Sequence, residues 1–214
     1  EFPDAQPALG YGLTETNAVG CLNFWSNYAD KPGSTGRAAK PFVEVVILGE
    51  RDRHLAKGDI GEVGIRTAAN IKGYWQNSDA TNDLFTADNF VRTGDVGYLD
   101  DDGYLFIVDR KKEIIIRGGE NISAAEVEAE LYACPEVAEV SVFGAPDERL
   151  GEVPVAIVLP KNGAQLNEES LRSFLDGRLA KFKIPERIIF ANEPLARLGT
   201  GKIDRRALKA QHAH

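Results

Sequence analysis

Four short segments of the sequence combine glycines with acidic, basic and hydroxyl side chains, the residue types that bind phosphates and metal ions. In chain order they are residues 11–16 (YGLTET), 92–95 (RTGD), 103–121 (GYLFIVDRKKE to RGGEN) and 199–202 (GTGK). The hydroxyl of Thr14 is suited to a phosphate oxygen. The carboxylate of Glu15 is suited to Mg²⁺, which takes few protein ligands and keeps its waters and the phosphates. Taken alone, however, a Thr-Glu pair is more often the start of a helix.

The segment at residues 199–202 superficially resembles a nucleotide-binding P-loop. That loop requires glycine five positions before Gly201 and serine or threonine after the lysine, and this sequence has Ala196 and Ile203 there. The segment is therefore not a P-loop. Lys202 instead lies on a glycine-flanked loop, from which its ammonium could reach a site formed by another domain and offset developing negative charge.

The remaining polar residues have plain structural interpretations when each is taken alone. Asp95 follows a glycine and is typical of a turn, Arg110 is typical of a surface ion pair of little consequence, and Lys112 is a solvated charge. Gly118 and Gly119 could simply connect two strands.

The order of the four segments changes this interpretation. Together they resemble the adenylate-forming superfamily, which includes acyl-CoA synthetases, peptide-synthetase adenylation domains and luciferases, and the resemblance covers nearly the whole chain. It implies an enzyme that converts ATP and a carboxylic acid to an acyl-adenylate and pyrophosphate, and then transfers the acyl group to the thiol of coenzyme A with release of AMP.

The resemblance also implies a role for each site residue in binding ATP or AMP with Mg²⁺. The motif that contains Tyr11 and Gly12 places the tyrosine against adenine, Thr14 on phosphate and Glu15 on the metal. Asp95 and Arg110 are matched to the ribose.

In the second half of the chain, the resemblance implies that Lys112 is the hinge of a mobile C-terminal domain. Gly119 would let the pantetheine arm of coenzyme A pass close to the backbone, and Lys202 would be the lysine of the adenylation step.

Two departures from the family pattern stand out. Residues 83–91 lack the Asp-Gly-Trp that often precedes the Arg-Thr-Gly-Asp motif. Ile116 also occupies a position at which luciferases have lysine, which argues against a luciferase-like activity.

Hydrophobic patterning predicts a β-rich first half and an α+β second half. Strands are expected at Phe42–Leu48, Glu62–Thr67, Val96–Leu99, Tyr104–Val108, Ile114–Ile116, Val137–Phe143 and Val153–Leu159. Helices are expected at 124–133, begun by a Ser123/Glu126 capping box, and after Asn167. Residues 1–30 are predicted to be loop and irregular structure.

The overall fold class expected is α+β, in two parts. Residues 1–109 would be the end of a large adenylation domain, with a small β-barrel-like subdomain, and residues 110–214 the compact mobile domain. The family's phosphate loop lies far upstream of the Tyr11 motif, and no such loop precedes Tyr11 here. We therefore expect a fragment that is inactive without an N-terminal part of the same protein, and the lack of any methionine agrees with truncation.

Composition narrows the possible partners and location. The formal net charge of −8 provides no general attraction for nucleic acid, and no apolar run approaches the ~20 residues of a membrane span. The two cysteines, Cys21 and Cys134, lack metal-ligand spacing and indicate a reducing cytoplasm.

Two other functions remain open: an adenylation domain that loads a carrier protein, and a non-catalytic docking module. The identity of the acid is also open, because both fatty and aryl acids suit the sequence; with a fatty acid, the enzyme would serve fatty acid metabolism.

Overall fold

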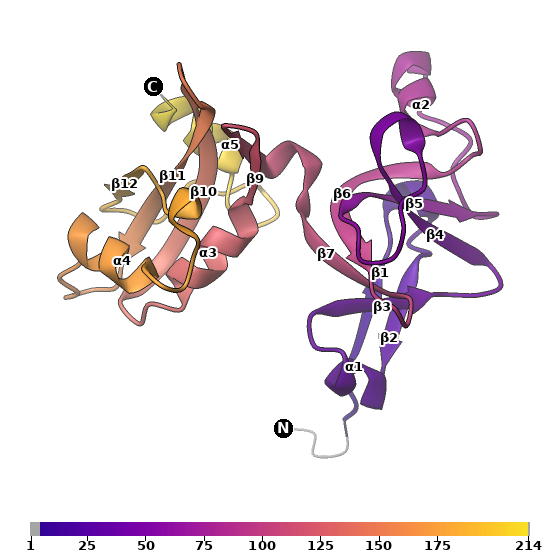
Figure 1. Cartoon of the computed structure of the whole chain (residues 1–214), viewed down its shortest axis with the longest axis horizontal. Coiled ribbons are helices and arrows are strands. Elements are labelled where there is room, and N and C mark those ends of the chain that lie inside the picture. The colour runs from indigo at the N-terminus through magenta and orange to yellow at the C-terminus, as the bar shows by residue number, and fades with distance from the viewer. Residues whose placement is uncertain (1–4, 214) are drawn as a thin grey trace. The chain divides into compact units, whose positions relative to one another are not determined.

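The computed structural model describes residues 5–213, and the chain divides between Lys111 and Lys112 into two compact units, each with its own sheet. The division lies two residues beyond the predicted boundary at 109/110. We describe each unit by itself (Figure 1).

The first unit is built on one antiparallel sheet of seven strands in the order β1-β2-β3-β7-β6-β5-β4. The strands are β1 (Ala8–Tyr11), β2 (Cys21–Phe24), β3 (Ser34–Ala38), β4 (Val43–Leu48), β5 (Gly61–Thr67), β6 (Val91–Leu99) and β7 (Tyr104–Arg110). In the described part of the chain the end strands β1 and β4 do not pair, so the sheet is open rather than a closed barrel.

Short helices connect these strands: η1 (Thr14–Thr16), α1 (Ser26–Asp30), η2 (Glu50–Asp52) and α2 (Ser78–Leu84). A further short helix, η3 (Lys111–Glu113), follows β7 and crosses the division between the units. The prediction of irregular structure for residues 1–30 is wrong for the described residues, since β1, β2 and α1 lie there; residues 1–4 fall outside the description. The reason is tertiary, because β1 and β2 are short strands that take their regular form from pairing with each other and with β3.

The second unit is a five-stranded sheet with helices on both faces. Its strands are β8 (Ile114–Arg117), β9 (Glu120–Ser123), β10 (Val137–Asp147), β11 (Gly151–Pro160) and β12 (Arg187–Phe190). Its helices are α3 (Ala124–Tyr132), α4 (Glu168–Leu175), η4 (Lys181–Lys183) and α5 (Arg205–His212). Strand β11 is central to the sheet: it pairs antiparallel with β10 and β8 and parallel with β12.

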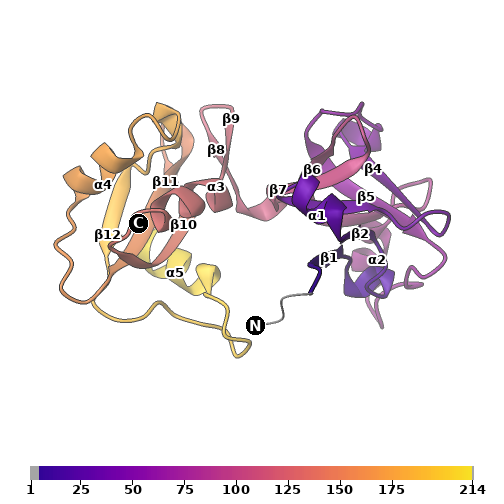
Figure 2. The same cartoon turned by 90° about the horizontal axis from the view of Figure 1, so that it is seen from below.

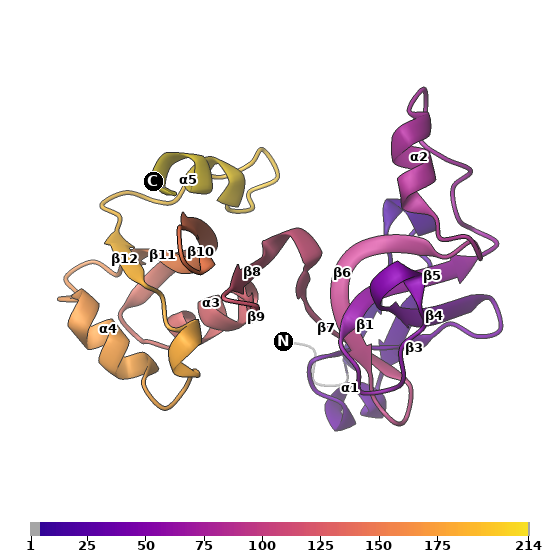
Figure 3. The same cartoon turned by 45° about the horizontal axis from the view of Figure 1, so that its top comes forward.

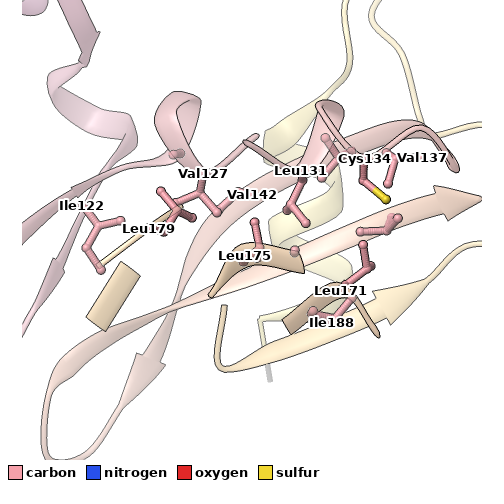
Figure 4. Close-up of a cluster of buried hydrophobic side chains, with 14 of the residues drawn as sticks. Ile122, Val127, Leu131, Cys134, Val137, Val142, Leu171, Leu175, Leu179 and Ile188 are labelled. Atoms are coloured by element: carbon pink, nitrogen blue, oxygen red, sulfur yellow. The ribbon is translucent and has the colours of Figure 1, made fainter. Parts of the chain in front are cut away.

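The alternation of side chains along β11 separates two cores. Ala156 and Val158 face a core with α3 and α4, whereas Val155 and Ile157 face a smaller core with Leu208 of α5. Figures 2 and 3 show α4 and α5 on opposite sides of this sheet. The larger core is drawn in Figure 4, where residues of α3 and α4 such as Leu131, Leu171 and Leu175 meet over the strands.

Both predicted helices in this unit begin at their predicted caps. Ser123 Oγ accepts from the Glu126 amide at 3.1 Å, and the Glu126 carboxylate accepts from Lys183 Nζ at 2.7 Å. Asn167 and Ser170 form a reciprocal capping box at the start of α4. The α+β class is thus confirmed. In residues 5–213, no helix is long and apolar enough to cross a membrane.

The separate cores lead to a first prediction. Leu131 is fully buried, so Leu131→Ala should lower the free energy of unfolding of the second unit by about 2–5 kcal/mol, because it leaves a cavity. Amide hydrogen exchange should accelerate in β10 and β11 and stay unchanged in β4 and β5. The control is Glu169→Ala, an exposed change on α4 that should alter neither. Equal acceleration in both units would contradict independent cores.

Candidate functional site

Tyr11 is the last residue of β1, and Gly12, Thr14 and Glu15 lie in the tight loop that follows it, between β1 and β2. A Cβ on Gly12 would come within 2.5 Å of the carbonyl oxygen of Ala18, so the loop closes only with glycine at this position. Thr16 Oγ1 accepts from the Leu13 amide at 3.1 Å and stabilises the η1 turn. The turn leaves Thr14 exposed and Glu15 half-buried.

This loop is held against residues 67–75. The Ile71 amide donates to the carbonyl of Glu15 at 2.9 Å, and Asn17 Nδ2 donates to the carbonyl of Ala69 at 2.6 Å. Tyr74 Oη donates to Glu15 Oε1 at 2.6 Å, and this hydrogen bond is the main reason that the pKa of Tyr74 is raised. Tyr74 lies 59 residues from its partner, so no local sequence signal indicated its role.

Of the charged residues that were predicted for the site, Asp95 is the most buried. Its side chain is 9% exposed on β6, and a buried carboxylate requires compensation. Tyr11 Oη donates to Asp95 Oδ2 at 2.7 Å, and Arg110 Nε lies 3.3 Å from Asp95 Oδ1. The structure therefore brings Tyr11, Asp95 and Arg110 together in the first unit.

A β-bulge determines which residue faces Asp95. Along the β6–β7 hairpin, Gly97 pairs with Ile107, but the register then shifts and Asp95 pairs with Arg110. Without that shift of one residue, Asp95 would face Asp109, a second carboxylate. Gly97 permits the close approach of the strands here, since a Cβ would lie 2.4 Å from the carbonyl oxygen of Phe106.

The predicted hinge residue Lys112 lies in the middle of η3 and is exposed. The boundary between the compact units falls between Lys111 and Lys112. A few residues later, Gly118 and Gly119 form the two-residue turn between β8 and β9, with φ of 60° and 90°. Both angles favour glycine, and a Cβ on Gly119 would meet no atom within 4 Å, so its outer side is open.

Lys202 lies on an exposed hairpin-like loop of the second unit. The loop closes through a bridge between Arg197 and Ile203 and a 2.8 Å bond from the Leu198 amide to the carbonyl of Lys202. Lys202 is exposed, and within residues 5–213 its ammonium has no hydrogen-bond or ion-pair partner.

No ready-made metal cage accompanies these residues: among the described residues no three His, Cys, Asp or Glu side chains cluster to hold an ion. A metal at Glu15 would have one protein carboxylate, with Oε1 shared with Tyr74.

The two parts of the chain match the two parts of one enzyme family. Residues 2–75 match the AMP-binding enzyme family, and residues 126–202 match the AMP-binding enzyme C-terminal domain. The chain belongs to the adenylate-forming, AMP-binding enzymes of the acyl-CoA synthetase type.

Among its relatives, the long-chain-fatty-acid–CoA ligase FadD13 of Mycobacterium tuberculosis is 40% identical over 95% of this chain, and the 2-succinylbenzoate–CoA ligase of Geobacillus kaustophilus is 42% identical over 93%. The chain spans about two fifths of each relative, 40% in both cases.

Solved structures of a further relative, MatB from Rhodopseudomonas palustris, cover 96% of this chain and are matched over 40% of their own length. The ATP-bound structure is 35% identical with a TM-score of 0.85, and the apo structure is 36% identical with a TM-score of 0.69.

The contact between Tyr11 and Asp95 leads to a pH prediction. Burial, and then the Asp95 carboxylate, raise the pKa of Tyr11 well above its ordinary 10.0. The hydroxyl therefore contributes stability below about pH 10, and this contribution is lost as the pH rises toward the folded-state pKa, because the unfolded tyrosine ionises first. Tyr11→Phe should lower the free energy of unfolding by about 1.5–3 kcal/mol at about pH 8. The difference from wild type should narrow toward pH 11.

Urea denaturation over this pH range measures both effects. Tyr28→Phe, a change on a ring that is 39% exposed, provides the control. A difference that stays constant with pH would mean that the Tyr11 hydroxyl is not the group that titrates.

Proposed function

We propose that this chain is the C-terminal part of an acyl-CoA ligase that uses ATP, a carboxylic acid and coenzyme A. The observation that carries the proposal is the Tyr11–Asp95–Arg110 cluster, in a chain that aligns along nearly its whole length with CoA ligases. Asp95 is the proposed ribose acceptor. Its two oxygens offer about four lone-pair positions, so its bonds to Tyr11 and Arg110 leave acceptors for two ribose hydroxyls.

In the first half-reaction, a carboxylate oxygen of the acid attacks the α-phosphorus of ATP, forms the acyl-adenylate and expels pyrophosphate. The Lys202 ammonium would stabilise negative charge on the attacking carboxylate and the α-phosphate. Thr14 would hydrogen-bond a phosphate oxygen, and Glu15 would supply a carboxylate oxygen to Mg²⁺, whose other ligands are phosphates and water. The ring of Tyr11 would lie against adenine.

In the second half-reaction, the thiol sulfur of coenzyme A attacks the acyl carbon, AMP leaves, and the thiol proton is lost. Gly119 would allow the pantetheine arm to pass the β8–β9 turn, where the space beside its Cα is open. The change between half-reactions would be a rotation of the second unit at Lys112.

The two MatB structures support this rotation. Both are structures of MatB from Rhodopseudomonas palustris, and they match this chain with TM-scores of 0.85 for the ATP-bound and 0.69 for the apo structure, the difference expected if the matched stretch changes conformation with ATP.

The names of the relatives favour coenzyme A over a carrier protein as acyl acceptor, but they include both a fatty acid and an aryl acid. We therefore propose no single acid. The two buried free cysteines support a reducing, cytoplasmic location.

The chain alone should not catalyse adenylation, since the proposed phosphate loop lies in the N-terminal part of the parent protein. We expect no pyrophosphate exchange with a panel of fatty and aryl acids, and weak binding of ATP with Mg²⁺ by calorimetry. Adding the N-terminal part should restore exchange. Robust exchange by the chain alone would contradict the proposal.

Lys202→Ala in the parent protein should slow adenylation by about a hundred- to a thousand-fold, because one preorganised charge is removed from the transition state. Thioester formation from preformed acyl-adenylate and coenzyme A should stay close to wild type, since Lys202 would then be turned away. Single-turnover assays of each half-reaction measure this. The control is Arg206→Ala, which removes an exposed cation on the same segment. Equal losses of rate in both half-reactions of Lys202→Ala would contradict the proposed role of Lys202.

A further inference from the structure

The three residues of η3 differ in how they are held. Lys111 and Glu113 each make an ion pair, and each pair stays inside one compact unit. For Lys112, between them, no ion pair or side-chain hydrogen bond is recorded in residues 5–213.

On the side of the first unit, Lys111 Nζ lies 2.7 Å from Glu62 Oε2. The lysine is 66% exposed, but the Glu62 side chain on β5 is only 11% exposed, so the acceptor has little freedom to move. Its other oxygen, Oε1, accepts from the Gly94 amide at 3.1 Å. One carboxylate therefore connects the start of η3 to the backbone directly beside Asp95.

On the side of the second unit, Glu113 pairs with Arg205, the first residue of α5. Arg205 also contacts Glu128 of α3 through two nitrogens, with Nε 3.1 Å from Oε1. Glu128 is in turn held by the Val142 amide at 2.8 Å. Because Arg205 lies three residues after Lys202, this network connects the end of η3 to the segment that carries the proposed adenylation lysine.

We propose that Lys111–Glu62 and Glu113–Arg205 are anchors that confine the hinge to the single residue Lys112, which makes Glu62 and Arg205 positioning residues. The role in catalysis rests on the proposed function, in which the second unit turns at this point. A pivot of one residue moves a rigid body along a defined path. A loose linker of three residues would spread the second unit over many orientations and lower the fraction with Lys202 or Gly119 correctly placed.

The confinement can be tested on the 214-residue chain without any substrate. Backbone ¹⁵N relaxation should give low order parameters at Lys112 and values near 0.85, typical of rigid backbone, at Lys111 and Glu113. Lys111→Gln should reduce the value at position 111 toward about 0.6, and Glu113→Gln should do the same at position 113.

Matched controls separate the anchors from general effects of charge. Lys111→Arg keeps the pair with Glu62 and should behave as wild type. Glu168→Gln removes a 2.7 Å ion pair with Arg172 elsewhere in the second unit and should leave η3 unchanged. Equal order parameters at positions 111, 112 and 113 in the wild type, or no response to either glutamine variant, would overturn the proposal.

A kinetic readout distinguishes positioning from a merely structural role. In the parent protein, Lys111→Gln and Glu113→Gln should each reduce kcat of the complete reaction by about three- to tenfold, while KM for ATP stays within about twofold, because binding groups are intact. Lys111→Arg should restore kcat. If neither glutamine variant lowers the order parameter at its own position, the proposed confinement of the hinge is wrong. If the wild-type parent has no ligase activity, the proposed function is wrong, but the relaxation result still holds.

Discussion

The buried carboxylate of Asp95 imposes a constraint on the whole first unit. A negative charge that is nearly removed from water needs hydrogen-bond or ion-pair partners, and neighbouring strands must place those partners beside it. The β6–β7 pairing supplies one of them through its bulge, which places Arg110 rather than Asp109 opposite Asp95. Strand β7 ends at Arg110. The same register therefore sets both the charge balance at Asp95 and the point at which the chain leaves the sheet as η3.

The other partner of Asp95 comes from the opposite end of the sequence. Tyr11 lies at the end of β1, and its loop closes because Gly12 tolerates the approach of Ala18. The loop is also tied to residues 67–75, so Glu15 meets Tyr74. These contacts connect the polar residues of the first unit to one another, and the proposed nucleotide site requires groups that are positioned in advance in this way.

In the second unit the predicted site residues are exposed rather than held by buried partners. Lys202 and Gly119 lie on exposed turns, while buried apolar side chains of the strands and helices form two cores in this unit. In the proposed function these groups serve a site formed by another domain, so each must project from its own unit while the structure below it supports its position. The Arg205 network, which ties α5 to α3 and to Glu113, is part of this support.

The sequence alone determined the elements whose signals are local. Short apolar runs typical of strands indicated β4, β5, β10 and β11, and capping residues Ser123 and Asn167 marked α3 and α4. Elements with weak local patterns were missed. Helix α5 has one buried residue, Leu208, and β12 is a short strand that depends on parallel pairing with β11.

For the candidate site, the order of motifs in the sequence was enough to nominate Tyr11, Asp95, Arg110 and Lys202. It could not show that Tyr11 and Asp95 touch, 84 residues apart, or that a bulge keeps Asp109 away from Asp95. Nor did it indicate Tyr74, Glu62 or Arg205, whose partners lie 49 to 92 residues away. Caps, turns and periodicity are properties of neighbouring residues, whereas the compensation of a buried charge depends on which strands meet, and only the tertiary structure decided that.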